Sequence, residues 1–400
     1  MIAGGDGKAL LKGVKVIDLT SVVFGPYCTQ ILADLGADVI KVEAPPAGDV
    51  FRHAGKPAVT PGMGPGFIAI NRGKQSVMLD LKSPDDAATM RNLLAEADIF
   101  VLNVRGKAAE RLGLDYDSVR AVRPDIIYLH CVGFGQDGPY ADLPAYDDVI
   151  QAASGTTSLL PRVDGNPQAR YLPSLIADKV SGLHGAYAVM AALIHRLRTG
   201  EGQQVEVPMF EAFTSFMLVE HLGGLTFDPP NAPVCYPRQI DPHRQPFRTA
   251  DGYISIAAYT DRDWGPLFRV LGNPGFLEAP EFATPRDRFH NIARLYEEAA
   301  RLTQQFTTDD LARRCAEANL PAQPARDIAT IMDDPHLAAT GFFRRREHPS
   351  EGGYFEMRPP VAFSAVPLEP LDPAPLLNAA KSPAAPKPVS LPSINRDKGD

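Results

Sequence analysis

The stretch VKVIDLTSVVFGPYCTQILADLGADVIKVE (residues 14–43) indicates the fold class. It begins with the apolar strand pattern VKVIDLT (residues 14–20) and ends with a second one, ADVIKVE (residues 37–43). Between them, PYCTQILADLG (residues 26–36) has helical spacing, with a proline near its start. A strand, a helix and a second strand in this order predict a βαβ unit, in which the two strands are parallel.

The same alternation continues through the first half of the chain. QSVMLDL (residues 75–81), DIFVLNV (residues 98–104) and DIIYLHCVGFG (residues 125–135) each predict a further strand. The run SPDD (residues 83–86) predicts a helix start, with a capping serine, a proline and two acids that complement the helix dipole. Near-continuous apolar strands separated by helices predict an α/β fold with a mostly parallel, doubly wound sheet.

Changes in composition and in the strand–helix pattern suggest the domain boundaries. A Pro-rich stretch (residues 228–248) interrupts the pattern, and a strand and a helix containing the single tryptophan follow it. We expect the first part of a large α/β domain over residues 1–210, a linker over 211–235, a smaller α/β domain over 236–323, a segment over 324–368 that returns to the large domain, and a Pro- and Ala-rich tail over 369–400 that is extended or disordered.

The composition bounds the class of protein. The 400 residues have 44% hydrophobic content and a formal charge of −8, which argues against nucleic-acid or membrane partners that need a broad basic face. The N-terminus lacks a signal-peptide core, so we expect a cytoplasmic protein. No histidine pattern predicts a metal site. The cysteines are scattered, as is typical of reduced thiols: Cys28, Cys131, Cys235 and Cys315.

One acidic residue, Asp178, stands at the head of an otherwise apolar helix in LPSLIADKVSGLHGAYAVMAALIHRLRTGEGQ (residues 172–203). Local sequence alone favours a capping acid that satisfies free backbone N–H groups. No GxSxG motif is present and no cysteine has an evident histidine partner, whereas a carboxylate can also act as a nucleophile. The two roles are compatible, because the capped N–H groups would hold Asp178 ionised.

Two loop features suggest a ligand at the ends of the strands. The string GFGQDG (residues 133–138) matches GxGxxG, but Pro139 follows it and the acid expected about 20 residues on is missing, which disfavours a dinucleotide site. A loop that lets backbone approach a ligand and a plain turn both fit it. Four basic residues, several of them just after strand ends, suggest a phosphate-binding edge: Arg72, Lys74, Arg105 and Arg111.

Taken together, the segments KGVKVIDLTSVVFGPYCTQILADLGADVIKVEAPPAGDVFR, INRGKQSVMLDLKSPDD and LIADKVSGLHGAYAVMAALIHRLRTGEGQQVEVPMFEA resemble the class III CoA-transferase family. This family includes formyl-CoA transferase, carnitine CoA-transferase and the α-methylacyl-CoA racemases, and the resemblance covers residues 11 to about 367. It implies a Rossmann-like large domain with a parallel sheet, built from both ends of the chain. It also implies a smaller α/β domain and an interlocked homodimer.

The resemblance also implies roles for single residues. The family's nucleophilic aspartate falls on Asp178, which attacks an acyl-CoA thioester to give an aspartyl anhydride; CoA then passes to a carboxylic acid through an aspartyl-CoA thioester. Coenzyme A enters as a thioester substrate and not as a permanently bound cofactor. Asn103, Val104 and Arg111 match CoA-binding segments, Val23 and Phe24 match an acyl-pocket turn, and Gly133 and Gly135 are candidates for binding an oxyanion.

Two differences between this sequence and known members of the family indicate which subfamily it resembles. Racemases of this family carry a His-Asp pair where this chain has Tyr146-Asp147, and a tyrosine is a poor proton acceptor at neutral pH. The region CYPRQIDPHRQPFRTADG (residues 235–252) lacks the glycine run of formyl-CoA transferase-like members. A CoA-transferase is therefore the leading hypothesis. The alternatives are a racemase or isomerase, a catalytically silent CoA-binding protein and, more weakly, a nicotinamide dehydrogenase.

Overall fold

The computed structural model describes residues 9–379, and their contacts divide them into two compact units. The first unit contains residues up to Ser154, Leu172–Phe216 and the segment from Phe342 onward. The second unit contains Gly155–Tyr171 and Met217–Gly341, so these contact-defined bounds differ from the range 236–323 that we predicted for the small domain. Each unit is described by itself.

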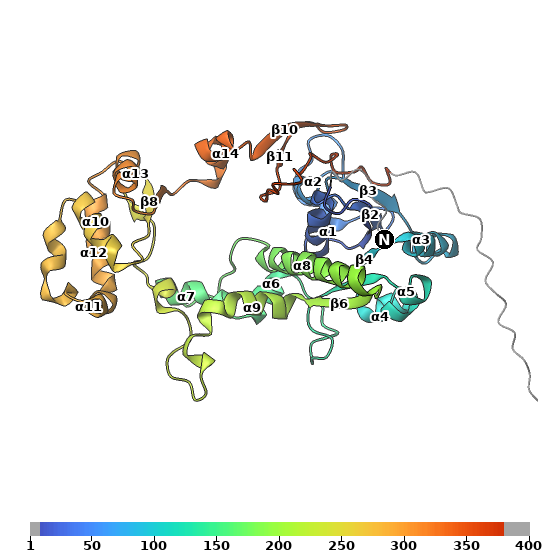
Figure 1. The fold of residues 1–400 in the computed structure, drawn as a ribbon, viewed down its shortest axis with the longest axis horizontal. Coiled ribbons are helices and arrows are strands. Elements are labelled where there is room, and N and C mark those ends of the chain that lie inside the picture. The colour runs from blue at the N-terminus through green and yellow to red at the C-terminus, as the bar shows by residue number, and fades with distance from the viewer. Residues whose placement is uncertain (1–8, 380–400) are drawn as a thin grey trace, which may run out of the picture. The chain divides into compact units, whose positions relative to one another are not determined.

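The first unit contains the six-stranded parallel sheet that the sequence predicts (Figure 1). Its strand order, β3-β2-β1-β4-β5-β6, is that of dinucleotide-binding α/β folds. The order reverses between β1 and β4, and this is where such sheets bind ligands. The strands are β1 (Lys15–Leu19), β2 (Asp38–Glu43), β3 (Lys74–Met78), β4 (Ile99–Leu102), β5 (Ile127–Val132) and β6 (Gln203–Pro208).

Helices flank this sheet. A buried cluster that includes Phe100 and Tyr128 contains residues from the sheet and from the helices α3 and α5. The helices of this unit are α1 (Phe24–Asp34), α2 (Pro65–Ile70), α3 (Pro84–Glu96), α4 (Gly106–Arg111), α5 (Tyr116–Val122), α6 (Asp147–Ala153), α8 (Ile176–Thr199) and the first part of α9 (Met209–His221), with a 3-10 turn at η1 (Val50–His53).

Helix α8 packs unusually close to α1 because two of its residues are glycines (Figure 1). A Cβ atom on Gly182 would lie 2.9 Å from the Phe24 carbonyl oxygen, and one on Gly185 would lie 3.1 Å from Cys28 Sγ. Larger residues at these two positions would push the helices apart. The close packing brings the first turn of α8, with Asp178, next to the start of α1.

The second unit is a smaller α/β unit with its own core, in which Trp264, Phe268 and Leu295 are buried. Its sheet is antiparallel and consists of β7 (Phe247–Arg248), β8 (Tyr253–Ile256) and β9 (Ala322–Pro324). The helices are α7 (Leu159–Asp164), α10 (Asp261–Val270), α11 (Pro285–His290), α12 (Ile292–Thr303), α13 (Thr308–Glu317) and α14 (Pro335–Ala339).

The C-terminal segment returns to the first unit through a hairpin of β10 (Phe343–His348) and β11 (Gly352–Met357). The described part of the predicted tail does not stay extended in solvent. The Pro375 carbonyl oxygen accepts hydrogen bonds from the buried Arg52 guanidinium, and the Asn378 side chain accepts from Met78 N–H. Ala374 is buried. Within the predicted tail, residues 369–379 form no helix or strand and make these contacts, and residues 380–400 lie outside the described range.

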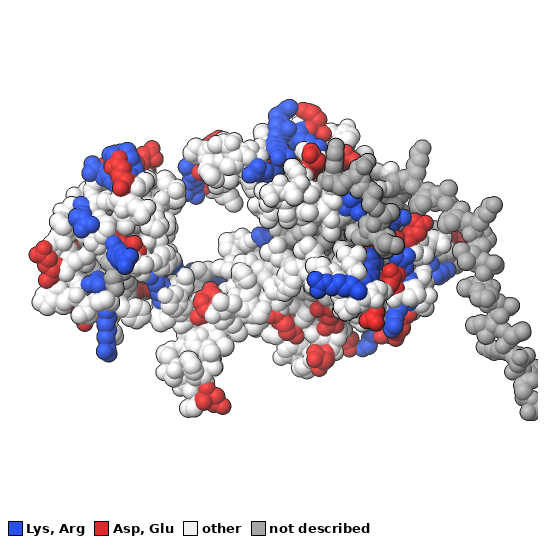
Figure 2. All heavy atoms as spheres, viewed as in Figure 1, with Lys and Arg blue, Asp and Glu red and all other residues white. Residues whose placement is uncertain are grey.

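Charged side chains of both signs are interspersed on the visible face of the first unit, and no broad basic patch forms there (Figure 2). Within residues 9–379, no helix is long and apolar enough to cross a membrane. In the same range, no group of three or more His, Cys, Asp or Glu side chains is placed to bind a metal ion.

Candidate active site

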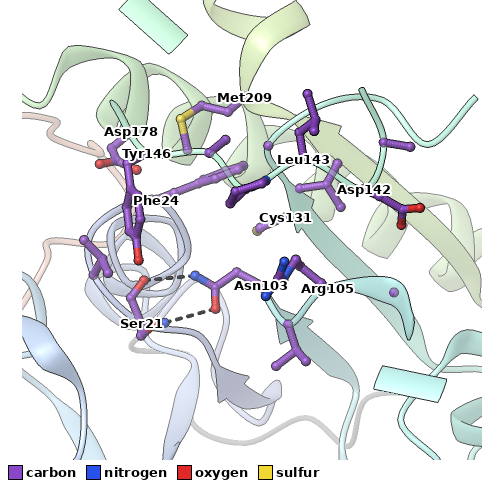
Figure 3. Close-up of a pocket in the computed structure, with 18 of the residues that line it drawn as sticks. Ser21, Phe24, Asn103, Arg105, Cys131, Asp142, Leu143, Tyr146, Asp178 and Met209 are labelled. Atoms are coloured by element: carbon purple, nitrogen blue, oxygen red, sulfur yellow. Dashed lines mark hydrogen bonds between the residues drawn. The ribbon is translucent and has the colours of Figure 1, made fainter. Parts of the chain in front are cut away.

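A cavity of about 330 Å³ lies at the carboxyl ends of β1, β4 and β5, and every residue that lines it belongs to the first unit. Parallel α/β sheets bind ligands at this edge. Seven of the predicted site residues line the cavity: Phe24, Asn103, Val104, Arg105, Gly133, Tyr146 and Asp178 (Figure 3). Sequence reasoning missed Ser21, Val22, Cys131, Gln136, Asp142 and Met209, which are polar or apolar loop and strand-end residues without a motif of their own.

Asp178 is the third residue of α8 and is only 6% exposed, yet it lines the cavity. The backbone N–H of Phe24, at the start of α1, lies near its carboxylate and lowers the pKa of the carboxyl. Figure 3 shows Asp178 beside Phe24 and Tyr146. The side chain is thus a nearly buried acid at the wall of the cavity.

We expected Asp178 itself to cap the N-terminus of α8, but the capping carboxylate is that of Asp147. The Asp147 Oδ2 atom accepts hydrogen bonds from Ala177 N–H at 2.7 Å and from Asp178 N–H at 3.1 Å. Gln151 Nε2 donates to the other carboxylate oxygen of Asp147 at 2.6 Å. Asp178 does lie in the first turn of α8, as predicted, but the capping bonds go to Asp147, which lies 31 positions away in the sequence, on α6, where local spacing does not reveal it.

The free N–H groups of α8 therefore do not hold Asp178 ionised. Burial, together with the nearby charge of Asp147, raises the pKa of Asp178 from its ordinary value of 3.8 to about 7, although the Phe24 N–H opposes the rise. A carboxyl with this pKa is about half ionised at neutral pH. Strongly shifted pKa values in a cavity are typical of catalytic groups.

The turn before α1 is fixed to the end of β4 by Asn103. Its side-chain amide accepts from Ser21 N–H at 3.2 Å and donates to the Ser21 carbonyl oxygen at 3.0 Å, as the dashed lines in Figure 3 show. Asn103 was predicted to bind CoA, and both of its polar atoms are already used within the protein. These bonds fix Asn103 in the cavity wall, and its binding of CoA stays a prediction.

Of the basic candidates, Arg105 alone lies at the cavity. It is exposed, and no other Lys or Arg of residues 9–379 lines this cavity. Arg111 is the last residue of α4 and is exposed away from the lining. Arg72 and Lys74 are nearly buried in ion pairs, Arg72 Nη2 at 2.6 Å from Asp34 and Lys74 Nζ at 3.1 Å from Asp18, so neither is available to a phosphate at this edge.

The predicted oxyanion glycines have packing roles. A Cβ atom on Gly133 would lie 2.4 Å from the Ala145 Cβ, which explains the need for glycine. The Gly135 N–H donates to Glu211 Oε1 at 3.0 Å and is therefore not free for an oxyanion. Val23 is buried behind the cavity wall and does not line it.

Cys131 lines the cavity, but burial raises the pKa of its thiol well above the usual value, so it is a poor source of thiolate. Tyr146 is 68% exposed at the rim. Neither side chain supplies a base for proton abstraction at neutral pH. The carboxylate of Asp178 is thus the group best suited to attack an electrophile in this cavity.

The α/β sheet has a cavity at its strand ends, and a buried carboxylate lies in the wall of that cavity. The chain belongs to CoA-transferase family III, whose family model matches residues 11–381. It is 33% identical to the succinate–glutarate CoA-transferase of Agrobacterium fabrum, over 92% of this chain and 93% of the relative. It is 30% identical to the human succinyl-CoA:glutarate CoA-transferase, over 92% and 83%.

Solved structures agree with this assignment. A CAIB/BAIF family protein from Brucella suis has a TM-score of 0.79 and 32% identity, covering 93% of this chain and 97% of that one. The orthorhombic form of Rv3272 from Mycobacterium tuberculosis has a TM-score of 0.79 and 31% identity, covering 92% and 97%. The protein is therefore a family III CoA-transferase, an enzyme that moves CoA between acyl-CoA thioesters and carboxylic acids.

Proposed function

We propose that Asp178 transiently carries first the acyl group and then CoA. Its carboxylate attacks the thioester carbonyl carbon, the C–S bond breaks, and CoA leaves as a thiolate. The thiolate then attacks the Asp178 carbonyl carbon of the anhydride, which releases the first acid and leaves an aspartyl-CoA thioester. An acceptor carboxylate repeats the two steps in reverse order, so that the new acyl-CoA forms and Asp178 is regenerated.

The observation that carries this proposal is the environment of Asp178. Within residues 9–379, Asp178 and Asp142 are the carboxylates that line the cavity. The Asp142 side chain is 73% exposed and pairs with Lys107 at 2.7 Å, so solvent and a cation stabilise its charge and lower its reactivity. Asp178 is nearly buried, with a pKa raised to about 7, and a more basic carboxylate is the better nucleophile.

The two carboxylates give a matched test of the proposal. We expect Asp178→Asn to lower the transfer rate by at least about 10³-fold, because the nucleophile is removed. Asp142→Asn should stay within about threefold of wild type. The rates are measured by liquid chromatography of the CoA esters. Turnover retained by Asp178→Asn, or an equal loss in both variants, contradicts the proposal.

We place the anionic part of CoA at Arg105, the exposed guanidinium on the cavity lining. Arg binds phosphate oxygens through a rigid donor fork. The segment Asn103 to Gly106 follows β4 directly, so it presents both this cation and backbone groups at the strand end.

We propose short dicarboxylic acids as the acid substrates. Support comes from relatives whose names specify such acids, namely the succinate–glutarate enzyme, a succinyl-CoA–L-malate CoA-transferase subunit of Chloroflexus aurantiacus and a succinyl-CoA:mesaconate CoA-transferase of Haloarcula hispanica. The relative Rv3272 is instead named a probable fatty acyl-CoA transferase. A panel of acceptors with succinyl-CoA should show faster transfer to glutarate or malate than to monocarboxylates. A preference for fatty acids overturns this assignment.

We also propose a homodimer, interlocked as in the family. Four large apolar side chains on α8 are more than half exposed in the single chain: Leu183, Tyr187, Ile194 and Leu197. A contiguous exposed apolar face of this kind marks an interaction surface, and a second copy would cover it. Light scattering should give twice the chain mass of 43.3 kDa. A stable monomer at assay concentration contradicts the dimer.

A further inference from the structure

The turn that precedes α1 contains a conformation that its residue type disfavours. Val22 has a φ of +71°, in the left-handed region, and it lines the cavity. For a β-branched residue this conformation is a genuine outlier, which persists only where the surroundings hold it in place. Such outliers cluster at functional sites.

The buried ion pair of Asp49 and Lys41 contacts the backbone of this turn, and neither residue lines the cavity. Asp49 Oδ1 accepts a hydrogen bond from Val22 N–H at 2.9 Å. Asp49 Oδ2 lies 2.9 Å from Lys41 Nζ, and the two side chains are 1% and 0% exposed. Lys41 Nζ in turn donates to the Thr20 carbonyl oxygen at 2.7 Å. The pair thus hydrogen-bonds to the backbone on both sides of Ser21, at the Thr20 carbonyl oxygen and the Val22 N–H.

This turn continues into the first residue of α1, Phe24, which lies next to the candidate nucleophile Asp178. Two residues after Val22, the Phe24 backbone lies beside the Asp178 carboxylate, as Figure 3 shows, and its N–H lowers the pKa of that carboxyl. Neither Asp49 nor Lys41 lines the cavity, so apart from the long-range effect of their charges the pair influences Asp178 through the backbone of Val22 to Phe24.

We propose that Asp49 and Lys41 are positioning residues: they hold Val22 in the left-handed conformation so that the Phe24 N–H faces the Asp178 carboxylate. This inference rests on the proposed role of Asp178. It assigns a catalytic consequence to a buried pair that, on its own, would serve only to stabilise the fold.

The direction in which the pH midpoint of kcat/KM shifts distinguishes a positioning role of Asp49 from a purely electrostatic one. The nearby Phe24 N–H lowers the pKa of Asp178, so moving it away raises the pH midpoint of kcat/KM. Simple removal of the negative charge of Asp49 acts in the opposite direction, because a lost negative charge lowers a nearby acid's pKa. The titratable groups around Asp178 are Asp147 on α6 and Tyr27 on α1, with Cys131, Asp142, Tyr146 and Arg105 on the cavity wall, and none of them changes in these variants.

The test uses Asp49→Asn with and without Val22→Gly. We expect Asp49→Asn to lower kcat/KM by about 10- to 100-fold in folded protein and to move its pH midpoint upward, because small displacements of reacting groups are costly. Glycine adopts positive φ without strain. The double variant should therefore regain at least about fivefold in kcat/KM and return the midpoint towards wild type.

A matched control is Glu351→Gln, which removes another carboxylate that accepts from backbone N–H groups, those of Val59 and Thr60. Glu351→Gln should leave the pH midpoint of kcat/KM unchanged. If Asp49→Asn does not fold, Val22→Pro keeps the Lys41–Asp49 pair but removes both the N–H that Asp49 accepts from and the positive φ, and it should give the same upward shift. An unchanged midpoint in either folded variant, or no recovery in the double variant, overturns the proposal. Failure of the proposed function would instead show as transfer retained by Asp178→Asn.

Discussion

Replacing the candidate nucleophile should stabilise the protein. A rise in the pKa of Asp178 from 3.8 to about 7 means that the folded state disfavours the ionised carboxyl by about 4 kcal/mol, at 1.36 kcal/mol per pKa unit. Because the folded pKa is raised, the protonated acid adds its full stability below pH 4, and this stability is lost as the pH rises through 7. Asn has the same shape and carries no charge.

We therefore expect Asp178→Asn to be more stable than wild type at pH 8 by up to about 4 kcal/mol, and this advantage to fall by more than half at pH 5. Urea unfolding followed by circular dichroism measures it, since the single tryptophan, Trp264, lies in the second unit. The exposed Asp142→Asn should stay within about 0.5 kcal/mol at both pH values. A difference that does not depend on pH, or a less stable Asp178→Asn at pH 8, refutes the reasoning.

Three further perturbations have defined outcomes. Asp147→Asn removes a charge that raises the pKa of Asp178, so the pH midpoint of kcat/KM should fall; an upward shift contradicts this. Arg105→Gln should raise KM for acyl-CoA about 10-fold or more with a smaller effect on kcat, and an unchanged KM would remove Arg105 from the CoA site. Glu43→Gln leaves the buried Arg52 guanidinium without its 2.7 Å partner and should cost about 3–5 kcal/mol in urea unfolding, whereas a loss below 1 kcal/mol would show that the pair is dispensable.

The sheet could be predicted from sequence because its information is local. Strands buried on both faces have apolar runs, as in Ile127–Val132, and the turn and cap residues between them mark the helices. The position of Asn103 to Arg105 at the cavity follows from the same pattern, since they come directly after a strand.

The partners of charged residues could not be predicted in this way. Lys74 follows a loop and suggests a phosphate ligand, but its ammonium is bound by Asp18, 56 positions earlier in the chain. The cap of α8 comes from Asp147 on another helix, and the cost of burying Asp178 depends on that same residue. These contacts are set by tertiary packing, which spacing in the sequence does not encode.

The central claim is that Asp178 forms a covalent bond to the acyl group, and trapping tests it most directly. The enzyme is incubated with succinyl-CoA, treated with hydroxylamine and digested, and the modified residue is located by mass spectrometry. We predict an aspartyl hydroxamate at Asp178 that requires acyl-CoA and is lost in Asp178→Asn. Efficient transfer with no modification at Asp178, or with modification at another residue, would contradict the account.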